Sequence, residues 1–111
     1  MKKDIQNVIK IAEKLDWSVQ VNEDELTFGN YSPAGQDFNI TITANNSEDI
    51  VKEIQERCNN FDCSEETFLW LDDTGHGTNG SPYDMKDLYE DMEFCLEMMQ
   101  ELYNALEEGK K

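Results

Sequence analysis

The sequence has few basic residues. Its 111 residues include 25 acidic and 9 basic side chains and one histidine, and the formal net charge is −16. Because like charges repel during approach, this deficit argues against direct binding to DNA, RNA or an anionic membrane surface. The basic residues leave three long gaps, from Lys14 to Lys52, from Arg57 to Lys86 and from Lys86 to Lys110.

Long apolar segments are also missing. No stretch approaches the roughly 20 apolar residues that a membrane-spanning helix needs. The first residues, Met1-Lys2-Lys3-Asp4, contain no apolar segment typical of a secretion signal, so we expect a cytoplasmic protein. A chain of this length has room for one modest core, and we therefore predict a single acidic domain over residues 1–111.

Metal-ligating residues are scarce. The three cysteines, Cys58, Cys63 and Cys95, are an odd number, which indicates reduced thiols in a chain without a secretion signal. No second ligand pair with zinc-site spacing follows Cys63, and we interpret Cys58 and Cys95 as small core residues. The calcium-loop pattern Asp-x-Asp-x-Asp-Gly is missing too, although clustered carboxylates keep divalent-cation binding as an alternative. We expect no cofactor.

Apolar residues recur with the period of an amphipathic helix in three segments. These are residues 4–15, a middle segment that follows the candidate N-cap Ser47, and residues 82–107. Residues 64–71 form a shorter apolar segment that begins at a candidate cap, Ser64, and we interpret it as a helix. A short buried strand over residues 65–71 is the alternative.

The last of these helices has sequence signals at both ends. Ser81 is suited to the N-cap position, and Pro82 is suited to the first helical position because its fixed φ matches a helix. Gly109 is expected to end the helix.

Between these helices the hydrophobic period changes to two, which is typical of strands. Three strands are expected, near residues 17–21, 26–29 and 38–44, with turns between them. Short connections favour an antiparallel arrangement. The prediction is an α+β fold, in which a three-stranded antiparallel sheet is covered on one face by an N-terminal helix, a middle helix and a long C-terminal helix. The first and last helices are expected to supply most of the cover.

Acidic residues are concentrated on the last helix. Six pairs spaced three or four residues apart carry like charges, against one opposite pair, Lys86–Glu90. At about 0.2–0.5 kcal/mol per pair, this repulsion costs about 1–3 kcal/mol before screening by salt. Carboxylates at this spacing lie about 5–6 Å apart, close to the separation of phosphates along a nucleic-acid strand.

This spacing predicts a surface that mimics phosphates and blocks a basic groove on a nucleic-acid-binding protein. The predicted surface comprises Asp84, Asp87, Glu90, Asp91, Glu93, Phe94, Glu97 and Glu101. Phe94 lies off the apolar stripe and is the expected aromatic anchor. Glu23, Asp24 and Glu25 form a possible second patch. The alternative is a small structural or adaptor protein whose charge serves only solubility.

Two short motifs point weakly toward an enzyme. Asp73-Thr74-Gly75 matches the signature of aspartic proteases, and Gly75-His76-Gly77-Thr78 resembles the histidine motif of subtilisin-like proteases. The first family is nearly all strand, whereas a long helix is predicted here, and the second needs a much longer chain. We therefore expect no enzyme, with Asp72, Asp73 and His76 as the local site if catalysis occurs.

Two segments resemble parts of a known family of proteins. One is Tyr31-Ser32-Pro33-Ala34-Gly35-Gln36-Asp37-Phe38, and the other runs from Leu69-Trp70-Leu71 through Gly80-Ser81-Pro82 into the acidic helix. Together they resemble small acidic uncharacterised proteins of gut bacteria and their mobile elements, over about residues 25–106. The motifs carry no assigned chemistry, so no catalytic residue is transferred. The resemblance implies a setting in which small acidic proteins inhibit host defences, as anti-restriction and anti-CRISPR proteins do.

Overall fold

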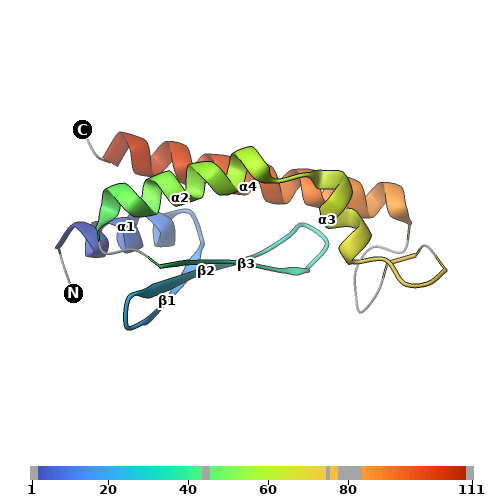
Figure 1. Ribbon diagram of the computed structural model, residues 1–111, viewed down its shortest axis with the longest axis horizontal. Coiled ribbons are helices and arrows are strands. Elements are labelled where there is room, and N and C mark those ends of the chain that lie inside the picture. The colour runs from blue at the N-terminus through green and yellow to red at the C-terminus, as the bar shows by residue number, and fades with distance from the viewer. Residues whose placement is uncertain (1–2, 44–45, 75, 78–83, 110–111) are drawn as a thin grey trace.

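The computed structural model describes residues 3–43, 46–74, 76–77 and 84–109. It has the predicted α+β architecture, with a three-stranded antiparallel sheet and helices packed on one of its faces (Figure 1). In chain order the elements are α1 (Lys3–Lys14), β1 (Ser18–Asn22), β2 (Glu25–Tyr31), β3 (Asp37–Thr43), α2 (Ser47–Asn60), α3 (Cys63–Leu69) and α4 (Met85–Gly109).

The sheet separates apolar from polar side chains because successive residues of a strand point to opposite faces. The strand order is β1-β2-β3, and the register pairs Leu26 with Ile42 and Phe28 with Ile40. These four side chains are buried beneath the helices. On the opposite, uncovered face, the hydroxyl oxygens of Thr27 and Thr41 are 3.1 Å apart across β2 and β3.

Both predicted turns are present. The β1–β2 turn places Glu23 at a φ of 57°, in the left-handed region. In the β2–β3 turn, the backbone N–H of Ser32 donates to the carbonyl of Gln36, and that of Gly35 donates to the carbonyl of Ser32. Gly35 has a φ of 89°, a conformation that glycine adopts without steric conflict.

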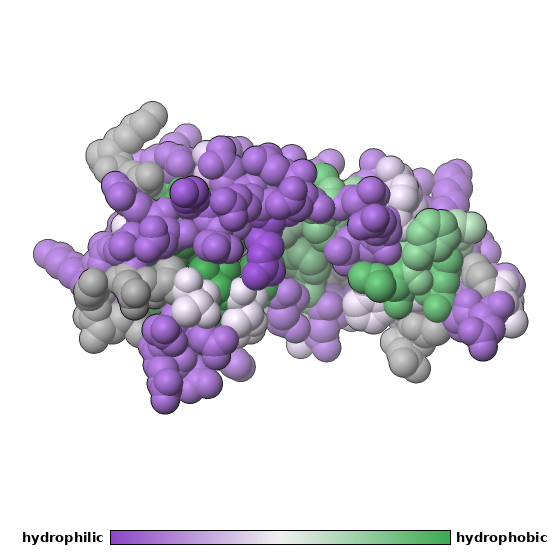
Figure 2. All heavy atoms as spheres, in the orientation of Figure 1, coloured by the Kyte–Doolittle hydropathy of each residue, from purple (hydrophilic) through white to green (hydrophobic). Residues whose placement is uncertain are grey.

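The molecule is elongated, with extents of 48 × 24 × 21 Å. Its length follows from α4, whose 25 residues span about 37 Å at about 1.5 Å per residue. The face shown in Figure 2 is largely hydrophilic, but apolar atoms gather at the end where α3 lies. None of the helices in the described ranges combines the length and apolar character needed to cross a membrane.

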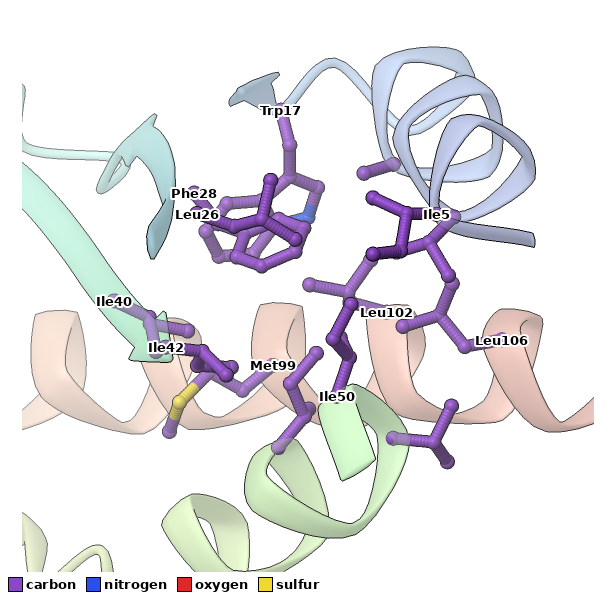
Figure 3. Close-up of a cluster of buried hydrophobic side chains, with 14 residues drawn as sticks. Ile5, Trp17, Leu26, Phe28, Ile40, Ile42, Ile50, Met99, Leu102 and Leu106 are labelled. Carbon is purple, nitrogen blue, oxygen red and sulfur yellow. The ribbon is translucent and has the colours of Figure 1, made fainter. Parts of the chain in front are cut away.

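The main core lies between the sheet and the three longer helices (Figure 3). Trp17 and the four inner side chains of the sheet meet residues from α1, α2 and α4 there. The helical contributions are Ile5, Val8 and Ala12 from α1, Ile50, Val51 and Ile54 from α2, and Met99, Leu102 and Leu106 from α4. The first and last helices thus supply six of these nine helical side chains, and the middle helix supplies the other three.

A second, smaller core extends the molecule beyond the sheet. Leu88, Met92 and Cys95 of α4 are buried there, and Cys63 and Trp70 from the α3 region pack against them. The N-terminal half of α4 is therefore covered by α3, while its C-terminal half takes part in the main core.

The helix starts differ from the predicted ones in two places. The N-cap of α2 is Asn46, whose side-chain oxygen accepts a hydrogen bond of 2.9 Å from the N–H of Asp49. The N-cap of α3 is Asp62, which accepts from Ser64 and Glu65. Asn and Asp cap as well as Ser does, so neighbouring candidates compete.

The remaining boundaries are close to the predicted ones. α3 is a helix, as preferred for residues 64–71, and only Leu71 takes part in an isolated β-bridge, with Gly77. α4 begins at Met85 and reaches Gly109. The predicted cap Ser81 and Pro82 lie outside the described residues.

Candidate interaction surface

Four glutamates form a continuous exposed strip along α4. Glu90, Glu93, Glu97 and Glu101 are all exposed. At about 100° per residue they fall within about 80° of arc, on the side of α4 opposite the buried stripe that includes Leu88, Cys95 and Leu102. We call these four residues the acidic ridge. Glu108, which was not part of the predicted surface, is exposed on the same side.

The ridge is not neutralised within the described parts of the chain. Lys86 is the only basic residue of α4, and no described lysine or arginine forms an ion pair with a ridge carboxylate. The lysines of α1 therefore leave the ridge charged. The predicted repulsion between neighbouring glutamates remains, screened only by solvent and salt.

Three further predicted residues flank the ridge. Asp84 and Asp87 are exposed at the start of α4, and Asp87 lies in its first turn, where the helix dipole favours a negative charge. Phe94 is 51% exposed, as expected for a side chain off the apolar stripe. Asp87 and Phe94 thus lie next to the ridge on the surface of α4, whereas Asp84 precedes the helix.

Asp91 was wrongly assigned to this surface. It is only 4% exposed. One carboxylate oxygen accepts a hydrogen bond of 3.0 Å from the backbone N–H of Ala34, and the other accepts one from the side-chain amide of Gln36. Asp91 is buried because it lies on the same side of α4 as Leu88 and Cys95. Its carboxylate holds the β2–β3 turn against the helix.

The second predicted patch lies elsewhere. Glu23 and Asp24 are exposed in the β1–β2 turn, and Glu25 is half-buried at the start of β2. Figure 1 shows this turn projecting on the sheet side of the molecule, away from α4. The patch and the acidic ridge therefore do not form one continuous surface.

An apolar groove lies beside the ridge, between α3 and α4. It encloses about 550 Å³. Its apolar lining comes from Phe68, Met85 and Tyr89, which are 64%, 48% and 39% exposed. Glu90 and Glu93 of the ridge also line this groove, so apolar and acidic surfaces meet. We call it the α3–α4 groove.

No pattern noted in the sequence predicted this groove. The composition of α3 contains a signal. Phe68 and Leu69 belong to a run of four apolar residues at the end of a seven-residue helix, and consecutive helical residues point about 100° apart. Such a run cannot all face one core, and Leu69 is exposed as well.

Two ionisable side chains between α3 and α4 have raised pKa values. Burial raises the pKa of the Cys63 thiol, and the nearby charges of Glu93 and Asp62 raise it further. Burial likewise raises the pKa of Glu66, with an added contribution from Glu65. Desolvation is therefore the main cause of both shifts.

The loop after α3 is organised by Asp72. Its Oδ1 accepts hydrogen bonds from the N–H and the hydroxyl of Thr74, at 2.8 and 2.6 Å, and from the N–H of His76 at 3.1 Å. These bonds, that of the Thr74 hydroxyl first, lower the pKa of Asp72. The Thr74 hydroxyl is also 2.9 Å from Nδ1 of His76. Asp72 and His76 are thus brought together as parts of one turn, while Asp73 is exposed.

Metal ligands do not converge in the described ranges, where no group of three or more His, Cys, Asp or Glu side chains is placed to hold an ion. Cys95 is buried and Cys58 is half-buried, and each packs against a core. Comparison of the chain with known protein families, curated proteins and solved structures found no match.

Proposed function

We propose that this protein is a non-enzymatic acidic binding protein that occupies the basic groove of a nucleic-acid-binding protein, such as a restriction or CRISPR component. The observation that carries the proposal is the acidic ridge. From Glu90 to Glu101 it presents four carboxylates along about 16 Å of helix. This row resembles the phosphates of a nucleic-acid strand in charge and spacing, and a cationic cleft would receive it.

The energetics of α4 support this proposal. Like-charge neighbours on a helix oppose folding, and lysines mixed among them would have removed the repulsion while keeping the helix soluble. The ridge has no such lysines after Lys86. Complementary charge acts mainly by accelerating association, so binding should be fast and should weaken as salt rises.

A capture experiment tests the proposal. The protein is immobilised, incubated with bacterial host lysate at low salt, and washed with a competing DNA duplex. We expect nucleic-acid-binding proteins to be retained and then released by the duplex. A variant with Glu90, Glu93, Glu97 and Glu101 changed to lysine should retain none of them.

A second variant controls for net charge. It changes four exposed acids outside the ridge, Glu13, Asp37, Glu56 and Asp73, to lysine. It has the same total charge as the ridge variant and should capture the same proteins as the wild type. Equal capture by the ridge variant and the wild type would contradict the proposal.

An adaptor role is the second candidate, and the α3–α4 groove favours it. Exposed apolar side chains gathered in one concave place often mark a protein–protein interface. In this case the charge of the ridge would serve only solubility. Substitution of the ridge would then leave partner binding largely intact, whereas substitution of Phe68 or Tyr89 would remove it.

A further inference from the structure

We infer that the α3–α4 groove is a docking site for a basic amphipathic helix of a protein partner. The inference rests on the proposed function for the basic character of that partner, and adds the kind of segment and the place where it binds. Phosphate mimicry by the ridge needs no apolar contact, so the groove is a separate feature.

The lining of the groove suits an amphipathic helix. Such a helix inserts apolar side chains spaced three or four residues apart into a hydrophobic groove. Phe68 extends from α3 and Met85 and Tyr89 extend from α4, so the apolar lining has two walls. The groove is open and has a volume of about 550 Å³.

The acidic residues that line the groove favour an occupant whose polar face is basic. Glu90 and Glu93 line the groove, and Lys86 is the only basic side chain among the described residues that line it. Cys63 lies at the contact between α3 and α4. Burial raises the pKa of its thiol most, and the charges of Glu93 and Glu66 raise it further. A helix flanked by lysine or arginine is attracted to this rim, while an acidic segment is repelled.

The same argument disfavours a second copy of this chain as the occupant. A second copy has a net charge of −16 and brings another acidic ridge. Glu90 and Glu93 belong to both the groove and the ridge, so a basic partner seated in the groove continues directly onto the ridge. One partner can therefore use both surfaces.

Peptide binding measured by fluorescence anisotropy tests the inference. The probe is a synthetic peptide of about 18 residues, or five helical turns, with leucine along one face and lysine or arginine elsewhere. A scrambled peptide of identical composition has the same charge but no apolar face. We expect the amphipathic peptide to bind at least about tenfold more tightly than the scrambled one.

Substitutions in the groove test whether the peptide binds there. Phe68→Ser combined with Tyr89→Ser should weaken binding of the amphipathic peptide at least about tenfold. The matched control, Val21→Ser with Tyr31→Ser, removes two exposed apolar side chains outside the groove and should have no effect. Met85→Gln gives an independent test should the double variant fail to fold. Equal binding of both peptides, or unchanged binding by the groove variants, would overturn the inference.

The remaining outcomes separate this inference from the proposed function. If the groove variants lose the peptide while the ridge variant still captures the wild-type partners from lysate, the groove is correct and the mimicry is wrong. If only the double variant Glu97→Lys with Glu101→Lys weakens peptide binding, the inference about the groove fails and the proposed role of the ridge is retained. A dimer seen by sedimentation that the groove variants abolish would assign the groove to a second copy and overturn the inference.

Discussion

At the residue scale, Asp91 is an acidic side chain whose charge is used inside the protein. Its carboxylate is buried and accepts hydrogen bonds from Ala34 and Gln36 of the β2–β3 turn. The ridge glutamates on the same helix are exposed. A structural carboxylate, Asp91, is therefore adjacent in sequence to Glu90, which is available to a partner, because neighbouring helical residues point about 100° apart.

Removal of the Asp91 carboxylate should destabilise the protein. Asp91→Ala removes the carboxylate that accepts from the Ala34 N–H and from the Gln36 side-chain amide, and loss of the acceptor for a buried donor costs about 1–3 kcal/mol. Urea unfolding measures this change. Glu97→Ala on the exposed side of α4 is the control and should not destabilise the protein, because it only removes the repulsion with Glu93 and Glu101. Equal effects of the two substitutions would contradict the role given to Asp91.

The thiols should react slowly in the native protein. Burial, with smaller contributions from Asp91 and other nearby groups, raises the pKa of Cys95 to about 12, and burial also raises the pKa of Cys58 and of Cys63. Because the thiolate is the reactive form, iodoacetamide at pH 8 should leave Cys95 unmodified by mass spectrometry. All three cysteines should be alkylated in urea. Rapid native modification of Cys95 would refute its burial.

At the element scale, α4 combines a buried stripe that stabilises the fold with a ridge that opposes it. The buried stripe includes Met92, Met99 and Leu106, which lie in the two cores. Burial of such a side chain contributes about 1.5–3 kcal/mol, so a few of them offset the repulsion of about 0.6–1.5 kcal/mol from the three like-charged pairs of the ridge. The helix remains stable although its exposed face is strained.

Salt and charge substitution should both relieve this strain. Glu93→Lys converts two like-charged neighbour pairs, with Glu90 and Glu97, into opposite pairs, and should stabilise the protein by about 0.5–1 kcal/mol. For a domain of this size that raises Tm by about 2–8 °C in a thermal melt at low salt. The gain should shrink in 1 M NaCl, where the Debye length is about 3 Å. Asp37→Lys, which changes the charge of β3 equally, should show no such gain.

Asp4 connects two helices through its charge. Its Oδ2 accepts a hydrogen bond of 2.8 Å from the N–H of Ser47 at the start of α2, and this bond lowers the pKa of Asp4. Because the folded pKa is depressed, the stabilisation is present above the unfolded pKa of about 3.9 and is lost as pH falls through the folded pKa.

The variant Asp4→Asn tests the contribution of the Asp4 charge to stability. Asp4→Asn keeps a side-chain oxygen that can accept from Ser47 but removes the ionised form. We expect it to unfold at lower urea concentration than the wild type at pH 7, and the difference should close below pH 4. A difference that does not depend on pH would mean that the charge of Asp4 is not involved.

At the scale of the whole molecule, the net charge of −16 acts on every approach of two copies. Self-repulsion keeps strongly charged proteins apart. We therefore expect a monomer of 12.9 kDa by light scattering at low salt, even though the α3–α4 groove exposes apolar side chains. A stable dimer at low salt would contradict this expectation.

Local patterns were sufficient to predict the order and type of the elements. Alternation through Leu26, Phe28, Ile40 and Ile42 indicated the inner face of the sheet, because side-chain direction in a strand depends only on position along it. Helical spacing indicated α1, α2 and α4 in the same way. The prediction of Ser47 as the cap of α2 was wrong, because the adjacent Asn46 also has a good capping side chain and occupies that position.

The sequence by itself determined the charge, the antiparallel meander and the row of glutamates along α4, because these follow from composition and from the periods of strand and helix. Only the tertiary structure decided which residues remain available to a partner. Asp91 became buried because the β2–β3 turn packs on that side of α4, and Phe68 became exposed because α3 presents its other side to the core. Burial depends on contacts between segments far apart in the chain, which no local pattern contains.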